Sequence, residues 1–272
     1  MLKTLTLGDS TTKKVHLAGW KKDKPDTRDF KLRGISHTLP GAALARSSSV
    51  DNSKKCSSVE DQGDLGSCTA NMFAGIIEYN NIRWRSWPKK KQISRLFHYY
   101  ATRLLEGTVN EDSGCYIRDT IKAGVQYGCV WERQWKYDVS KFTINPPAKL
   151  WTSAGEHKVV SYHRIDDGDV ETMKDTLAAG YLIGFGFEVY SNFMTQQMAT
   201  SGELHRPGSH DVLQGGHAVV LVGYDDARKA FKVRNSWGKG WGLDGYFWMD
   251  YNYVADANLC NDFWVVNSGV EI

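Results

Sequence analysis

The spacing of apolar residues changes near residue 158, and this change divides the 272-residue chain into two parts. Before it, apolar residues recur at helical spacing in 63–81, 94–107 and 116–128. After it, apolar and alternating runs predict strands, interrupted by one helix at 169–180. Helices in one half and strands in the other predict an α+β fold. The helical lobe is expected at about 50–150 and an antiparallel, barrel-like sheet lobe at about 151–272. The predicted strands are KVVSYHRI, YLIGFGFEVY, HAVVLVGY, FKVRNSW and YFWMDY.

Two of the predicted helices carry sequence signals at their ends. In 94–107, Ser94 can cap the N-terminus and Gly107 can end the helix. In 169–180, Asp169 and Gly180 have the same two roles. The stretch 191–214, between two predicted strands, is too long for a hairpin connection. It is therefore interpreted as a functional or mobile loop.

Cys68 stands at the beginning of the first predicted helix, after two glycines. Free backbone N–H groups and the helix dipole stabilise an anion at a helix N-terminus, so the position favours a thiolate. A cysteine can also be a small buried apolar residue, which is the commoner use. The other polar candidates in the chain decide between these readings.

His217 begins a predicted strand, and Asn235 follows the next one. The separation of Cys68 and His217 is 149 residues (217 minus 68), within the roughly 130–150 typical of one class of thiol peptidase. A cysteine, a histidine and an amide that are distant in sequence fit a nucleophile, a base and a residue that orients the base.

Three motifs resemble those of the papain family of cysteine peptidases and occur in the family's order: QGDLGSC, GGHAVVLVGY and RNSWGKGWG. The resemblance covers roughly residues 50–267. It is nearest to the compact bacterial and phage branch, which carries DQGxLGSCTAN and a short GWxxDxPDxRD arm. Here these read DQGDLGSCTAN and GWKKDKPDTRD.

The resemblance implies a role for each matched residue. Cys68 is the nucleophile, His217 the general base and acid, Asn235 the residue that orients the imidazole, and Gln62 an oxyanion-hole donor. It also implies a polypeptide substrate, no cofactor and no metal; His205 and His210 do not have the spacing of zinc ligands. The residues assigned to the substrate cleft are Gly66, Gly114, Ala218 and Trp237, the last also covering the His–Asn hydrogen bond.

Two positions depart from the plant and lysosomal pattern. Leu65 replaces a disulfide cysteine and Thr69 replaces an aromatic residue beside the nucleophile. The five cysteines are irregularly spaced, which favours a reducing compartment. The N-terminus is too polar for a signal peptide, and no apolar run is long enough to span a membrane. We expect a cytoplasmic monomer, or packaging into a phage particle.

Residues 1–49 are predicted to form a basic arm preceding the catalytic domain, 50–272. Residues 1–55 hold 12 Lys/Arg and 5 Asp/Glu, a net charge of +7, which leaves 22 minus 26, or −4, for the remainder. No nucleic-acid-binding motif accompanies this charge, so nucleic acid is not an expected partner. The arm is expected to be either a plug in the substrate cleft, as a short pro-segment would be, or a strap packed on the domain.

Two other functions remain open from the sequence. A papain-like protein without catalysis could bind a partner through the same cleft. A related thiol amidase could attack cell-wall or isopeptide bonds. The presence of all four polar site residues and of RNSWG favours a peptidase.

Overall fold

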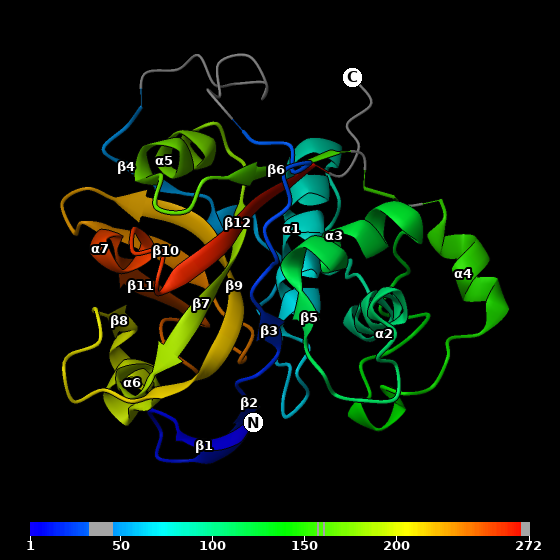
Figure 1. Ribbon diagram of the computed structural model, residues 1–272, viewed down its shortest axis with the longest axis horizontal. Helices are drawn as coiled ribbons and strands as arrows, with labels where there is room; N and C mark the ends of the chain where they lie inside the picture. The colour runs from blue at the N-terminus through cyan, green and yellow to red at the C-terminus, as the bar shows by residue number, and fades with distance from the viewer. Residues whose placement is uncertain (33–45, 157, 160, 268–272) are drawn as a thin grey trace.

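The computed structural model describes residues 1–32, 46–156, 158–159 and 161–267. Figure 1 shows a helical lobe beside a sheet lobe, with the long helix α1 (Cys68–Arg85) between them. The α+β architecture predicted from the sequence is confirmed. The further helices of the helical lobe are α2 (Arg95–Glu106), α3 (Ile117–Gln126) and α4 (Ala148–Ala154).

The predicted helix caps are present. The Ser94 side chain accepts a hydrogen bond from the backbone N–H of Phe97 at the start of α2, and Gly107 ends that helix in the left-handed region, with φ 71°. Asp169 caps α5 (Val170–Ala178) in the same way as Ser94 caps α2. Local sequence was therefore sufficient to predict where these helices begin.

The sheet lobe is built on an eight-stranded sheet in the described part of the chain, with the order β6-β12-β7-β9-β10-β11-β8 and with β4 paired to β9. Neighbouring strands are antiparallel except for the short parallel pair β8 and β11. The strand β12 was not predicted, although it lies between β6 and β7. The strands are β4 (Ser49–Asp51), β6 (Ser161–Ile165), β7 (Ile183–Tyr190), β8 (Glu203–Leu204), β9 (Leu213–Asp225), β10 (Ala230–Arg234), β11 (Tyr246–Asp250) and β12 (Cys260–Asn267).

The segment 191–214 is folded, so the expectation of a mobile loop is not met, while the alternative, a functional segment, stays a prediction. It contains a 3-10 turn at Ser191–Met194, the helix α6 (Gln196–Ser201) and β8. Met198 and Ala199 enter the sheet-lobe core, which holds the segment against the lobe. A short helix α7 (Tyr251–Val254) follows β11.

The N-terminal arm folds into strands that local sequence did not predict. The strands β1 (Leu2–Thr6) and β2 (Thr12–His16) form an antiparallel hairpin. The strand β3 (Trp20–Lys21) then pairs in parallel with β5 (Cys115–Tyr116) of the helical lobe. In Figure 1 this blue segment passes between the two lobes. Predicted-arm residues 33–45 lie outside the described residues.

Candidate active site

Cys68 is the first residue of α1, and its side chain is fully buried. The backbone N–H of Ala218, on β9, donates a hydrogen bond to Cys68 Sγ over 3.4 Å. The start of the central helix and the middle of the sheet therefore meet at this thiol.

His217 and Asn235 are joined by a hydrogen bond, although they lie on different segments. His217 is on β9, Asn235 directly follows β10, and His217 Nε2 lies 2.8 Å from Asn235 Oδ1. This contact places the imidazole proton on Nε2. His217 Nδ1 is then a buried acceptor without a hydrogen-bond partner among the described residues, free to take a proton.

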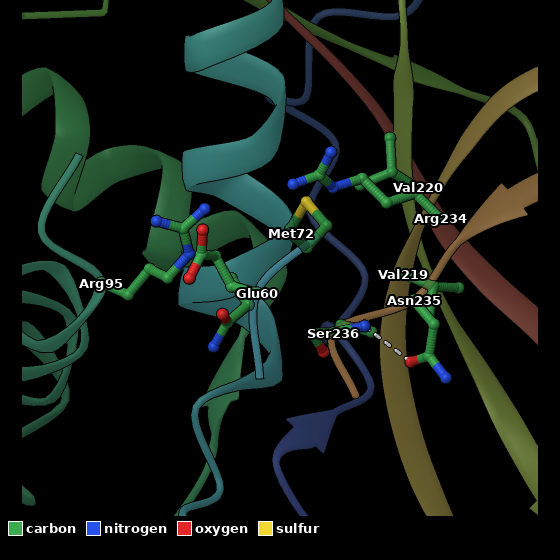
Figure 2. Close-up of a pocket in the computed structure, with 10 residues that line it drawn as sticks. Glu60, Met72, Arg95, Val219, Val220, Arg234, Asn235 and Ser236 are labelled. Carbon is green, nitrogen blue, oxygen red and sulfur yellow. Dashed lines mark hydrogen bonds between the residues drawn. The ribbon is translucent and has the colours of Figure 1, made fainter. Parts of the chain in front are cut away.

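The Asn235 amide is held by its own neighbours. Ser236 donates its backbone N–H to Asn235 Oδ1 over 2.8 Å, the contact drawn as a dashed line in Figure 2. The indole of Trp237 stacks on His217, with ring centroids 5.0 Å apart. Trp237 is itself buried, so it shields the His217–Asn235 contact from water.

Gln62 is fully buried beside these residues. Ser236 Oγ donates to Gln62 Oε1 over 2.6 Å, while Gln62 Nε2 donates to the carbonyl of Leu65 over 2.9 Å. The serine therefore fixes which end of the amide is the acceptor. Sequence reasoning did not single out Ser236, although it lies in the RNSWG motif that identified Asn235.

The arm covers the thiol directly. An added Cβ on Gly19 would lie 2.6 Å from Cys68 Sγ and 2.7 Å from the Gly66 carbonyl oxygen, so only glycine fits there. The carbonyl of Gly19 accepts from Cys115 N over 2.9 Å, and the carbonyl of Leu17 accepts from Gly216 N over 3.0 Å. The arm backbone is thus hydrogen-bonded to both lobes on either side of Cys68.

The four residues assigned to the substrate cleft all lie around this point. Gly66 and Gly114 contact the arm at Gly19, and Gly114 adopts φ 64°, which favours glycine. Ala218 holds the thiol as described, and Trp237 lies behind His217. The arm therefore occupies the space onto which the predicted substrate-binding glycines open.

Burial sets the protonation of the two central groups. It raises the pKa of the Cys68 thiol to about 12, against the opposing effect of the Ala218 N–H. It lowers the pKa of His217 to about 4, against the opposing effect of the hydrogen bond that His217 Nε2 donates to Asn235 Oδ1. The prediction that the helix N-terminus lowers the pKa of the thiol is wrong for this conformation, because desolvation under the arm outweighs it. Both groups are neutral near pH 7.

A small cavity adjoins the site, lined by Glu60, Arg95 of α2, and residues of α1, of the strands β9 and β10, and of the segment that follows β10 (Figure 2). Its volume is about 10 Å³, which is too small for any part of a peptide. Among the described residues, no group of three or more His, Cys, Asp or Glu side chains could hold a metal ion. In the same part of the chain, no helix is long and apolar enough to cross a membrane.

All five cysteines are free and buried: Cys56, Cys68, Cys115, Cys129 and Cys260. We predict that any activity requires a thiol reductant, whereas folding requires no oxidation, because Cys68 must stay reduced to react. Activity and melting temperature should be measured with and without dithiothreitol. A fall in melting temperature on reduction would contradict the prediction.

Comparisons with known proteins show the family to which the chain belongs. A family model described as papain family cysteine protease matches residues 45–263. An uncharacterised peptidase C1-like protein of Acanthamoeba polyphaga mimivirus is 39% identical over 267 residues, which cover 91% of this chain and 86% of that protein. Cathepsin B-like CP2 of Giardia intestinalis is 27% identical over 253 residues, covering 89% and 72% of the two chains. The structure of xylellain, a cysteine protease from Xylella fastidiosa, is similar with 34% identity, a TM-score of 0.84 and coverage of 99% of both chains.

Proposed function

Because the chain belongs to the papain family of cysteine proteases, we propose that it hydrolyses peptide bonds with Cys68 as nucleophile and His217 as its base. The observation that carries the proposal is the buried His217–Asn235 hydrogen bond, which leaves His217 Nδ1 without a hydrogen-bond partner among the described residues. The next residue along β9, Ala218, donates its backbone N–H to Cys68 Sγ. A base oriented by a third group is the arrangement that activates a thiol.

The reaction begins when Cys68 gives its proton to His217 Nδ1. The thiolate attacks the carbonyl carbon of the scissile bond, and negative charge develops on the carbonyl oxygen. Gln62 Nε2 and the backbone N–H of Cys68 stabilise this charge. His217 then protonates the leaving amine, and a thioester remains on Cys68. Water, activated by His217, hydrolyses the thioester and restores the thiol.

The arm must leave the thiol before this sequence can start. Gly19 covers Cys68, and in that state the pKa of the thiol is about 12 and that of His217 about 4. Proton transfer from such a thiol to such an imidazole is strongly unfavourable. We therefore propose that residues 1–32 regulate the enzyme by occupying the cleft. In this proposal the arm has both roles considered from the sequence, plug and strap, since Leu5, Val15 and Leu17 also pack into the sheet-lobe core.

A peptide-like, thiol-reactive probe tests the function. The probe is expected to label the protein once, on Cys68, and to abolish hydrolysis of a peptide library in proportion to labelling. Peptide mapping by mass spectrometry identifies the labelled residue. Labelling without any peptide hydrolysis would contradict the peptidase proposal. A cell-wall digest run in parallel tests the amidase alternative.

A further inference from the structure

Asp112 is a carboxylate at the candidate site to which the proposed mechanism gives no role. Both of its oxygens accept from the backbone N–H of Gly66, over 3.0 and 3.1 Å. The Tyr99 hydroxyl donates to Asp112 Oδ1 over 2.6 Å and accepts from the backbone N–H of Gly114 over 3.2 Å. Asp112 therefore lies between the two glycines that face the arm.

The carboxylate is close to the thiol. Its charge adds to the burial effect that raises the pKa of Cys68. A fixed negative charge beside a nucleophile that must ionise works against catalysis. A positively charged group on the bound substrate would neutralise the Asp112 carboxylate and remove this effect on the Cys68 thiol.

The arm places His16 against this carboxylate, with His16 Nε2 3.5 Å from Asp112 Oδ2. Burial lowers the pKa of His16, and the charge of Asp112 opposes that effect. The imidazole is thus mostly neutral near pH 7, and its Nε2 also lies 3.2 Å from the amino group of Met1. Among the described residues, His16 is the only basic side chain within 4 Å of Asp112, and the charge of Asp112 also opposes the burial effect that lowers the pKa of the Met1 amino group on the arm. The Asp112 side chain is 25% exposed even with the arm in place.

We propose that Asp112 forms an anionic subsite that selects a lysine or arginine on the N-terminal side of the scissile bond. The inference rests on the proposed peptidase function and names a substrate class for it. When the arm leaves, His16 leaves with it, and the carboxylate keeps only neutral donors from the body of the enzyme. A substrate ammonium or guanidinium supplies the missing charge and forms a charge-assisted hydrogen bond.

The test uses fluorogenic peptides that are identical except at one position. Lysine is compared with norleucine, which has a similar length without the charge, at each of the three positions preceding the scissile bond. The ratio of kcat/KM for the two peptides removes differences in arm occupancy and in intrinsic chemistry. We expect lysine to be favoured by about tenfold or more at one position, as one charge-assisted hydrogen bond allows. The preference should weaken as salt is raised.

Two variants locate the effect. Asp112→Asn keeps an acceptor for Gly66 and Tyr99 but removes the charge, and it should bring the ratio close to one. Glu111→Gln removes an exposed charge from the neighbouring residue and should leave the ratio as in the wild-type chain.

The outcomes separate the two proposals. Equal cleavage of both peptides by the wild-type chain, or a ratio unchanged in Asp112→Asn, overturns the subsite while the peptidase stands. The second result would mean that Asp112 only holds the Gly66 loop. If no peptide is cleaved by the wild-type chain or by Gly19→Ala, in which the arm should no longer cover the thiol, the proposed function fails and the subsite fails with it.

Discussion

Replacing Cys68 with alanine is expected to abolish peptide hydrolysis while the protein stays folded. The sulfur forms the covalent bond in the proposed mechanism, and no other nucleophile contacts Ala218 N or lies under Gly19 in the described structure. The loss in kcat/KM should exceed about 10³-fold, as for other enzymes that lose their nucleophile. Steady-state kinetics on a peptide substrate measures it, and circular dichroism checks the fold.

Companion variants show whether the residues act as one unit. His217→Ala should be nearly as severe, and combining it with Cys68→Ala should add little. Asn235→Ala should cost less, because the amide orients the ring without exchanging protons with substrate. Cys129→Ala is a matched control, since it removes another buried thiol that lies in the core. Substantial turnover by Cys68→Ala would show that the nucleophile has been misassigned.

Replacing Gly19 with alanine is expected to activate the enzyme. The new Cβ would lie 2.6 Å from Cys68 Sγ and 2.7 Å from the Gly66 oxygen, so the covered state is strained while the open state is not. Overpacking of this kind costs roughly 1–3 kcal/mol. A shift of that size in the arm equilibrium raises activity about 5- to 150-fold, up to the limit set by the fully open enzyme.

Reactivity of the thiol provides a second readout. A thiol with a pKa of about 12 is almost entirely protonated at pH 7. Removing the cover re-exposes Cys68 to water and lowers its pKa toward the ordinary range, so the thiolate fraction at fixed pH increases. Alkylation of Cys68 by iodoacetamide at pH 7 should therefore be faster in Gly19→Ala than in the wild-type chain.

The control is Gly8→Ala, another arm glycine, which faces Thr200 and not the thiol. It should leave both activity and alkylation as in the wild-type chain. Deleting the whole arm is a poorer test, because Leu5, Val15 and Leu17 belong to the core and their loss would lower stability as well. Unchanged activity in Gly19→Ala, with the wild-type melting temperature, would mean that the arm does not limit access to the thiol.

Local sequence predicted several parts of the molecule. The helical spacing of apolar residues predicted α2 and α3, and the cap residues predicted where α2 and α5 begin. The three motifs predicted which residues would meet around Cys68. The helices and their caps depend on residues close together in the chain, and the motifs were recognised by their resemblance to a family. Both kinds of prediction can be made without knowing how the chain packs.

Other features became visible only in the tertiary structure. The strand β12 is enclosed between β6 and β7, and its pairing is with segments distant in sequence. The short strand β3 pairs with only two residues of the helical lobe, too few to leave a period in the sequence. Strand formation there depends on the partner backbone.

By itself, the sequence determined the α+β class, the helix that begins at Cys68, and the set of residues brought to it. Only the tertiary structure decided the state of that thiol. A helix N-terminus favours a thiolate, and this much can be read from the residues around Cys68. The arm at Gly19 removes water from the same sulfur, and the cost of burying its charge is the larger effect, so the pKa rises to about 12. Desolvation of the Cys68 thiol depends on which distant segment packs over it, and the residues around Cys68 do not predict that segment.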